Sequence, residues 1–178
     1  EGETITLSDS VTLNSSCQEV AQLADSIRQS LITNPGSCDS RWPNYYNYST
    51  TRNQCVYCNT LVGIAHTETG HYNLGNFGDS PGWYQKWEDE GKLIKNENGK
   101  MNITKIAEGD VIFFNIQRTS GLCILCHVGI VCEVHGDRIL SCEANIGTNK
   151  KQTYPLLENG TLGSHSGIKV NAIGHICD

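Results

Sequence analysis

The sequence lacks long apolar segments, internal repeats and low-complexity tracts. No hydrophobic run approaches the roughly 20 residues of a transmembrane helix, so we expect no membrane span. No linker or shift in composition divides the 178 residues, a length typical of one domain. We therefore predict a single domain over residues 1–178, in which the polar residues 1–16 form an extended arm.

An excess of positive charge is also missing. The chain has 13 Lys and Arg against 19 Asp and Glu, which gives a net charge of −6, and the charges are interspersed. Nucleic acids and anionic membrane surfaces attract basic patches. We therefore expect neither a nucleic acid nor a membrane as partner, and we expect a monomer.

Cysteine, in contrast, is abundant, with nine in the chain. Outside the cytosol, such a content is typical of disulfides. One free nucleophile and four disulfides would account for the odd number. The pairing stays open, although Cys17 and Cys38 could link the first predicted helix to the loop that follows it.

Two further features fit a secreted chain. The sequence begins at Glu1 without a signal-peptide pattern, as a processed secreted form would, and we expect this localisation. Four Asn-x-Ser/Thr sequons fit a glycoprotein, at Asn14, Asn47, Asn102 and Asn159.

Helix patterns come first in the chain and strand patterns later, which predicts the α+β class. Helices are expected over 17–32, with an apolar face that contains Val20, Leu23, Ala24, Ile27 and Leu31, over 55–67, and over 80–90. Strands are expected from Val111 onward, including 127–134, 138–145, 151–157 and 168–177.

Cys55 and His127 are the candidate nucleophile and base. Cys55 begins an apolar helix, where backbone N–H groups and the helix dipole favour a thiolate. His127 begins the strand-like run HVGIVCEV. A thiol nucleophile needs such an imidazole to hold it as thiolate. Cys58 lies one helical turn after Cys55 and could compete for the role or bond to Cys55, but we expect it to face inward and to pair elsewhere.

The strand after His127 predicts residues that orient its ring. A three-residue turn at 135–137 sets His127 opposite Asn145, and side chains alternate along a strand with period two. His127, Glu143 and Asn145 then share one face. We expect Asn145, with Glu143 close behind, to fix the tautomer of the imidazole. A two-residue turn at Gly136-Asp137 would instead turn both residues away.

Other polar and aromatic residues near Cys55 are weaker candidates. Gln54 could supply an oxyanion donor beside the Cys55 backbone N–H, or could simply cap the helix. Four aromatic residues could line a substrate groove, or could simply pack: Trp42, Tyr46, Tyr48 and Tyr57.

Four short motifs between Asn53 and Ile146 together resemble the CHAP family of cysteine, histidine-dependent amidohydrolases/peptidases. They are NQCVY at Cys55, EGDVIFF, HVGIV at His127, and EAN at Glu143. The resemblance implies a papain-like fold, with N-terminal helices packed on a C-terminal antiparallel sheet and stapled by disulfides. It also implies that the substrate is bacterial peptidoglycan, cleaved by an N-acetylmuramoyl-L-alanine amidase or an endopeptidase of the NlpC type. Cys55, His127, Asn145 and Glu143 would be catalytic, with no metal or other cofactor.

The sequence is also compatible with several alternatives. One is a disulfide-stapled secreted binding module without turnover, and another is a cysteine peptidase or amidase that acts on substrates outside the cell wall. Cys55-x-x-Cys58 and Cys123-x-x-Cys126 could form a four-thiolate zinc site, but the gap between the pairs is much longer than in a zinc ribbon. A redox pair at Cys55 and Cys58 lacks the buried strand that should precede it.

Overall fold

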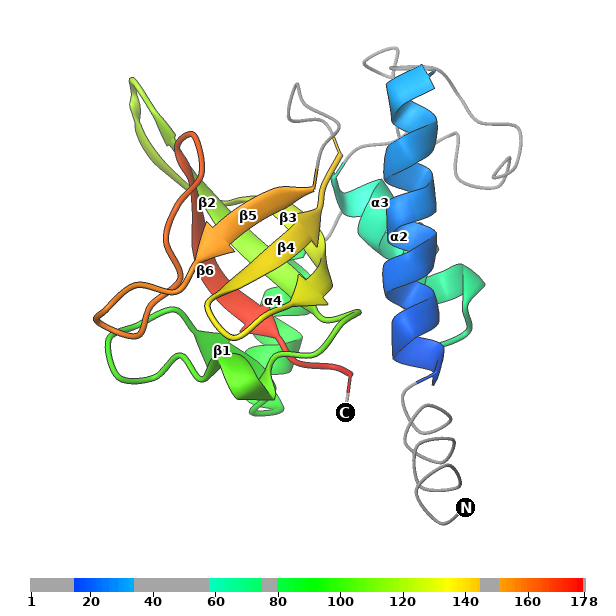
Figure 1. Ribbon diagram of the computed structural model, residues 1–178, viewed down its shortest axis with the longest axis horizontal. Coiled ribbons are helices and arrows are strands. Elements are labelled where there is room, and N and C mark those ends of the chain that lie inside the picture. The colour runs from blue at the N-terminus through cyan, green and yellow to red at the C-terminus, as the bar shows by residue number, and fades with distance from the viewer. Residues whose placement is uncertain (1–14, 34–57, 75–79, 145–150, 178) are drawn as a thin grey trace.

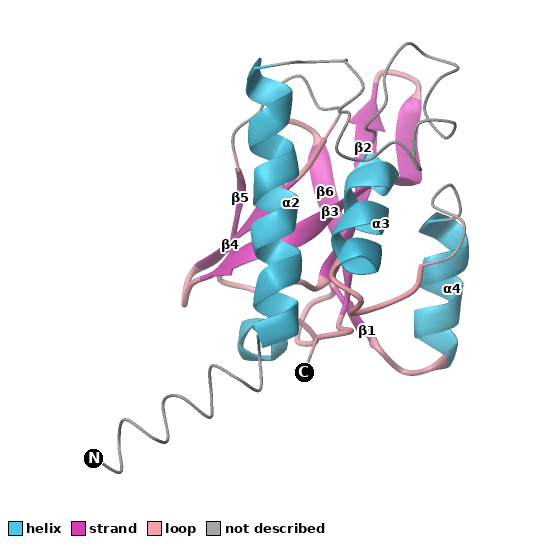
Figure 2. Ribbon diagram, turned by 90° about the vertical axis from the view of Figure 1, so that its right-hand side faces the viewer, coloured by secondary structure: helices cyan, strands magenta, loops and turns pink. Residues whose placement is uncertain are grey.

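A curled antiparallel sheet with helices on one face forms the body of the protein (Figures 1 and 2). The computed structural model describes residues 15–33, 58–74, 80–144 and 151–177. The helices in this part are α2 (Ser15–Thr33), α3 (Cys58–Glu68) and α4 (Ser80–Asp89), with a 3-10 turn η3 (Ile103–Lys105). The strands are β1 (Leu93–Lys95), β2 (Val111–Arg118), β3 (Gly121–Val134), β4 (Arg138–Cys142), β5 (Gln152–Pro155) and β6 (Ile168–Gly174). They are ordered β1-β6-β2-β3-β4-β5, and the predicted α+β class is confirmed.

The helices pack by the faces that their sequences predict. Val20, Ala24 and Ile27 lie three to four residues apart on α2 and are fully buried. Figure 2 shows α2, α3 and α4 on one side of the sheet. After α4, Gly91 takes a left-handed φ of 71°, and its N–H donates to the carbonyl of Glu88, a common way to end a helix.

Two apolar layers lie on opposite faces of the sheet, and β2 contributes to both. Val111 and Phe113 belong to the layer beneath the helices, whereas Ile112 and Phe114 belong to the layer on the other face. All four side chains are fully buried. This explains why β2 reads as a continuous apolar run and not as an alternating strand.

The turn between β3 and β4 differs from the three-residue turn expected at 135–137, and that expectation is wrong. The His135 N–H donates to the Arg138 carbonyl over 2.9 Å, so only Gly136-Asp137 form the turn. Next to it, Val134 pairs with Ile139.

A bulge in β3 nevertheless restores the predicted pairing farther along the hairpin. The register shifts between Val131 and Glu133, and Val131 then pairs with Ser141. The extra residue in one strand offsets the shorter turn. Glu143 therefore lies on the same face as His127.

Two disulfides are present among the described residues. Cys123 pairs with Cys126 within β3, and Cys132 pairs with Cys142 across β3 and β4. The first pair excludes the four-thiolate zinc site. The predicted link between Cys17 and Cys38 is wrong, because Cys17 forms no disulfide and its Sγ lies 3.2 Å from His71 Nε2. Across the described segments, none of the helices has the length and apolar character that spanning a membrane requires.

A substitution in the core tests the packing of the helices on the sheet directly. Phe113 is fully buried and contacts Tyr84 and Trp87 edge-on. Phe113→Ala should lower the free energy of unfolding by about 3–5 kcal/mol in urea titrations, because it removes a large apolar side chain and leaves a cavity. Ile124→Ala, at a residue that is 66% exposed, should change it by about 0.5 kcal/mol or less. Equal effects would contradict the packing.

Candidate active site

Cys58 is the first residue of α3, and its half-buried thiol is free of any disulfide. Helix α3 packs against α2 and β3 through its apolar residues. Leu61, Val62 and Ala65 are fully buried in these contacts. The N-terminus of a helix carries partial positive charge and unpaired N–H groups. Cys58 therefore occupies a position that favours its thiolate.

His127 lies on β3, opposite Phe114 on β2, and its ring packs on the Phe114 ring with centroids 5.3 Å apart. Just before it, Leu125 has a φ of 55°, and its N–H donates to the Asn115 side chain over 2.9 Å. The β2–β3 register shifts between Phe114 and Ile116. Such irregularities often redirect a side chain beside an active site.

The Glu143 carboxylate binds one nitrogen of the His127 ring. Its Oε1 lies 2.7 Å from His127 Nε2. Its Oε2 accepts a hydrogen bond from the Tyr154 hydroxyl at 2.8 Å and another from the Ser141 hydroxyl. Glu143 is only 1% exposed, and three donors surround its carboxylate. A buried carboxylate is tolerated when it is paired and hydrogen-bonded in this way.

Gly129 makes room for this carboxylate. A Cβ at this position would lie 2.9 Å from Glu143 Cγ and 3.1 Å from the Cys142 carbonyl oxygen. Real Cβ atoms essentially never come as close as the first distance, so the Glu143 side chain would have to shift, and the second contact is tight. Glycine at 129 is therefore part of the geometry that brings Glu143 to His127.

The Cys58 thiol and the His127 ring shift each other's ionisation. Burial favours the neutral forms of both groups. For Cys58, the hydrogen bond and charge of His127, with backbone hydrogen bonds from Val128 and Asn59, outweigh burial and lower the pKa of the thiol. For His127, burial is outweighed by hydrogen bonds and charges from Cys58 and Glu143, which raise the pKa of the imidazole to about 9. Each group therefore favours the charged form of the other.

The phenol of Tyr154 stays protonated beside this pair. Burial and the neighbouring Glu143 carboxylate raise the pKa of Tyr154 well above its ordinary range. The raised pKa favours the protonated hydroxyl, which donates the hydrogen bond to Glu143 Oε2. Neither Tyr154 nor Ser141 was a predicted site residue, although Ser141 and Glu143 are two apart and the period of a strand places them on one face.

The structure brings two predicted site residues, His127 and Glu143, into contact. It also corrects the expectation for Cys58, which faces His127 and does not pair with another cysteine. The remaining candidates lie outside the described residues and keep the status of predictions: Trp42, Tyr46, Tyr48, Gln54, Cys55, Tyr57 and Asn145.

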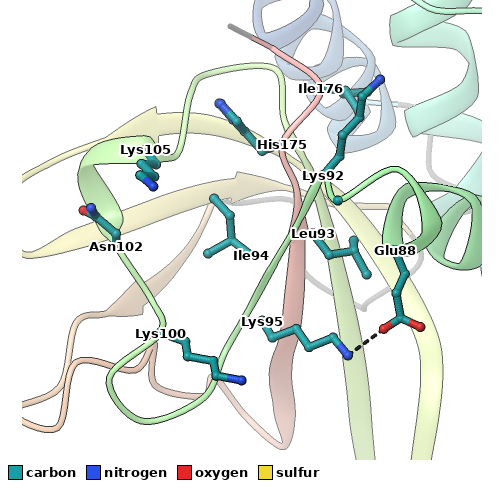
Figure 3. Close-up of a pocket in the computed structure, with 11 residues that line it drawn as sticks. Glu88, Lys92, Leu93, Ile94, Lys95, Lys100, Asn102, Lys105, His175 and Ile176 are labelled. Carbon is teal, nitrogen blue, oxygen red and sulfur yellow. Dashed lines mark ion pairs between the residues drawn. The ribbon is translucent and has the colours of Figure 1, made fainter.

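A recess of about 1000 Å³ surrounds the edge strand β1 and is separate from this site (Figure 3). Its basic side chains are Lys92, Lys95, Lys100 and Lys105. Three of them form ion pairs with nearby glutamates over 2.5–3.5 Å, Lys95 with Glu88, Lys100 with Glu97 and Lys92 with Glu90. These pairs offset much of the positive charge, so the recess does not form a concentrated anion site.

Comparison of the chain with protein-family models, with curated proteins and with solved structures finds no match.

The ionisation of Cys58 can be tested by its reaction with iodoacetamide. The reaction should be fast well below pH 8.5, where an ordinary thiol is mostly protonated, because the pKa of the Cys58 thiol is lowered. His127→Ala should shift the profile to the pH range of an ordinary thiol. The rate is measured by mass spectrometry of the Cys58 peptide across pH. An unchanged profile in the variant would show that His127 does not ionise Cys58.

A substitution at Gly129 tests whether Glu143 positions His127. Gly129→Ala should displace Glu143 from the His127 ring and slow a reaction that depends on His127 by about 100-fold, the cost of a misplacement of about 1 Å. Gly136→Ala is the matched control, because its Cβ would meet nothing within 4 Å. The alkylation rate of Cys58 at neutral pH measures both. Equal rates in the two variants would contradict the positioning role of Glu143.

Proposed function

We propose that the protein is a thiol hydrolase that cleaves amide bonds, with Cys58 as nucleophile, His127 as acid and base, and Glu143 as the residue that orients His127. One observation carries the proposal. A free thiol at a helix N-terminus lies against a buried histidine, and the second nitrogen of that histidine is bound to a buried carboxylate. In such an arrangement the histidine can activate the thiol and the carboxylate can orient the histidine.

The chemistry follows from the two nitrogens of the His127 ring. Glu143 occupies Nε2, so Nδ1 is the nitrogen that serves Cys58. The thiolate attacks the amide carbonyl carbon, and the imidazolium donates its Nδ1 proton to the leaving amine as the C–N bond breaks. Water, deprotonated by the neutral imidazole, then attacks the thioester, which releases the carboxylic acid and restores the thiolate–imidazolium pair.

Cys58 replaces Cys55 as the proposed nucleophile. The resemblance to the CHAP family rested on Cys55, which lies outside the described residues. Cys58 is three residues farther along and contacts the histidine that the resemblance also identifies. The order thiol, histidine, carboxylate along the chain is unchanged, and helices packed on an antiparallel sheet are compatible with the proposed papain-like arrangement.

Peptidoglycan is the substrate that we propose, in a secreted enzyme without a cofactor in the reaction. The CHAP-like motifs support the substrate, because two of them contain His127 and Glu143. The disulfides Cys123–Cys126 and Cys132–Cys142 support an oxidising compartment. A net charge of −6 leaves binding to the anionic wall to specific contacts and not to bulk attraction.

The test is digestion of purified peptidoglycan, followed by mass analysis of the released fragments. The native chain should release fragments with one new amine and one new carboxylic acid per cut, and their masses identify the bond. Cys58→Ala and His127→Ala should each abolish the release, and the double variant should be little worse, because members of one catalytic unit are not additive. Cys55→Ala is the matched control for the choice of thiol and should retain activity.

Three outcomes would contradict parts of the proposal. Loss of activity in Cys55→Ala, with full activity in Cys58→Ala, would return the nucleophile to Cys55. Cleavage of peptides but not of peptidoglycan would contradict the substrate and leave the thiol chemistry. Binding to peptidoglycan without release of fragments would identify a binding module instead of an enzyme.

A further inference from the structure

A second group of cysteine and histidine side chains lies at the other end of α3. His71 Nε2 is 3.2 Å from Cys17 Sγ and 3.9 Å from Cys177 Sγ, and the three atoms lie within 4.8 Å of one another. Cys17 belongs to the first turn of α2, His71 follows α3, and Cys177 follows β6. In Figures 1 and 2 the C-terminal segment ends beside the first turn of α2. Three distant parts of the chain thus meet at one point.

A second histidine fixes which nitrogen of His71 carries the proton. His66 Nε2 lies 2.9 Å from the Gly109 carbonyl oxygen, which can only accept, so Nε2 donates. His66 Nδ1 is then the acceptor for His71 Nδ1, which lies 3.3 Å away. The lone pair of His71 therefore lies on Nε2, the atom between the two sulfurs. Metal-binding histidines are commonly held in this way through their other nitrogen.

The backbone around Gly109 and Asp110 is shaped to hold the cysteines. Gly109 has a φ of 95°, and a Cβ there would lie 2.6 Å from the Cys17 carbonyl oxygen and 2.9 Å from Cys177 Sγ. Asp110, which is fully buried, accepts hydrogen bonds from the backbone N–H groups of Ile176 and Cys177 at 3.1 and 2.9 Å. The backbone at Cys177 is therefore held in place by a buried carboxylate.

We propose that Cys17, His71 and Cys177 bind a zinc ion that ties α2, the segment after α3 and the C-terminal segment together. Two thiolates and one imidazole form a ligand set that zinc prefers. With ordinary bond lengths, sulfur and nitrogen ligands of a tetrahedral zinc lie roughly 3.5 Å apart, and the two sulfur–nitrogen distances here, 3.2 and 3.9 Å, lie on either side of that value. The described residues supply three ligands, and a water or one further protein group completes the four.

The zinc site is separate from the proposed catalytic thiol. Cys58 and His66 lie near opposite ends of α3, and eight residues of helix span about 12 Å. The ion therefore has a structural role and does not contact the substrate. Its binding is independent of the proposed hydrolysis.

The test uses the full chain, purified without reductant, exposed to Zn²⁺ and passed through a desalting column. Elemental analysis should find one zinc per chain in the native protein. His71→Gln and Cys177→Ser should lose the zinc, whereas Cys58→Ser, the matched cysteine control, should retain it. A strong chelator should lower the thermal midpoint of the native protein and not that of His71→Gln.

One measurement does not depend on whether the variants fold. Substitution of Co²⁺ in the native chain should give a thiolate-to-metal charge-transfer band, which requires no variant. Absence of zinc and of this band in the native protein would overturn the proposal. A disulfide between Cys17 and Cys177 in nonreducing peptide maps of the folded chain would overturn it as well, and so would retention of zinc in His71→Gln.

Discussion

The buried Glu143 carboxylate is the group around which the second half of the structure is organised. A charge that is 1% exposed costs several kcal/mol unless donors surround it, and here His127, Ser141 and Tyr154 do so. These donors come from β3, β4 and β5. The strands must therefore pair in one register, because a slip of one residue would turn the donors to the opposite face.

Several local irregularities serve this register. The bulge in β3 offsets the two-residue turn, and Gly129 leaves space for the carboxylate. Two residues before His127, Leu125 takes a φ of 55°. None of these features strengthens the hydrogen bonding between the strands. Bulges and positive φ angles cost stability, and their concentration around one histidine fits a site under functional constraint. The carboxylate in turn raises the pKa of His127, which then favours the thiolate of Cys58.

Much of the fold follows from patterns in the sequence. Period and caps give α2 and α4 to within two residues, and the order of helices and strands gives the class. The shared face of His127 and Glu143 follows from counting along a hairpin. A three-residue turn and a two-residue turn followed by a bulge both pair Val131 with Ser141, and no local pattern predicts the bulge.

Other features depend on contacts between distant residues. Cys55 and Cys58 are only three residues apart in the sequence, and the contact of Cys58 with His127 depends on how α3 packs against β3. Cys17 and Cys177 lie near opposite ends of the chain, and the sequence suggested Cys38 as the partner of Cys17 because it was near. Strand β1 has three residues and is held by β6, without an apolar pattern of its own. Whether such a short segment forms a strand depends on its pairing with a neighbouring strand in the folded protein.

The central claim is that Cys58 and His127 form an ion pair in the folded protein. It is tested most directly by the nitrogen-15 chemical shifts of His127 in selectively labelled protein at pH 7. The account predicts an imidazolium with both nitrogens protonated, and a neutral ring with a lower pKa in Cys58→Ala, because the thiolate is among the groups that raise the pKa. A neutral His127 ring at pH 7 in the native chain, or an imidazolium unaffected by Cys58→Ala, would contradict it.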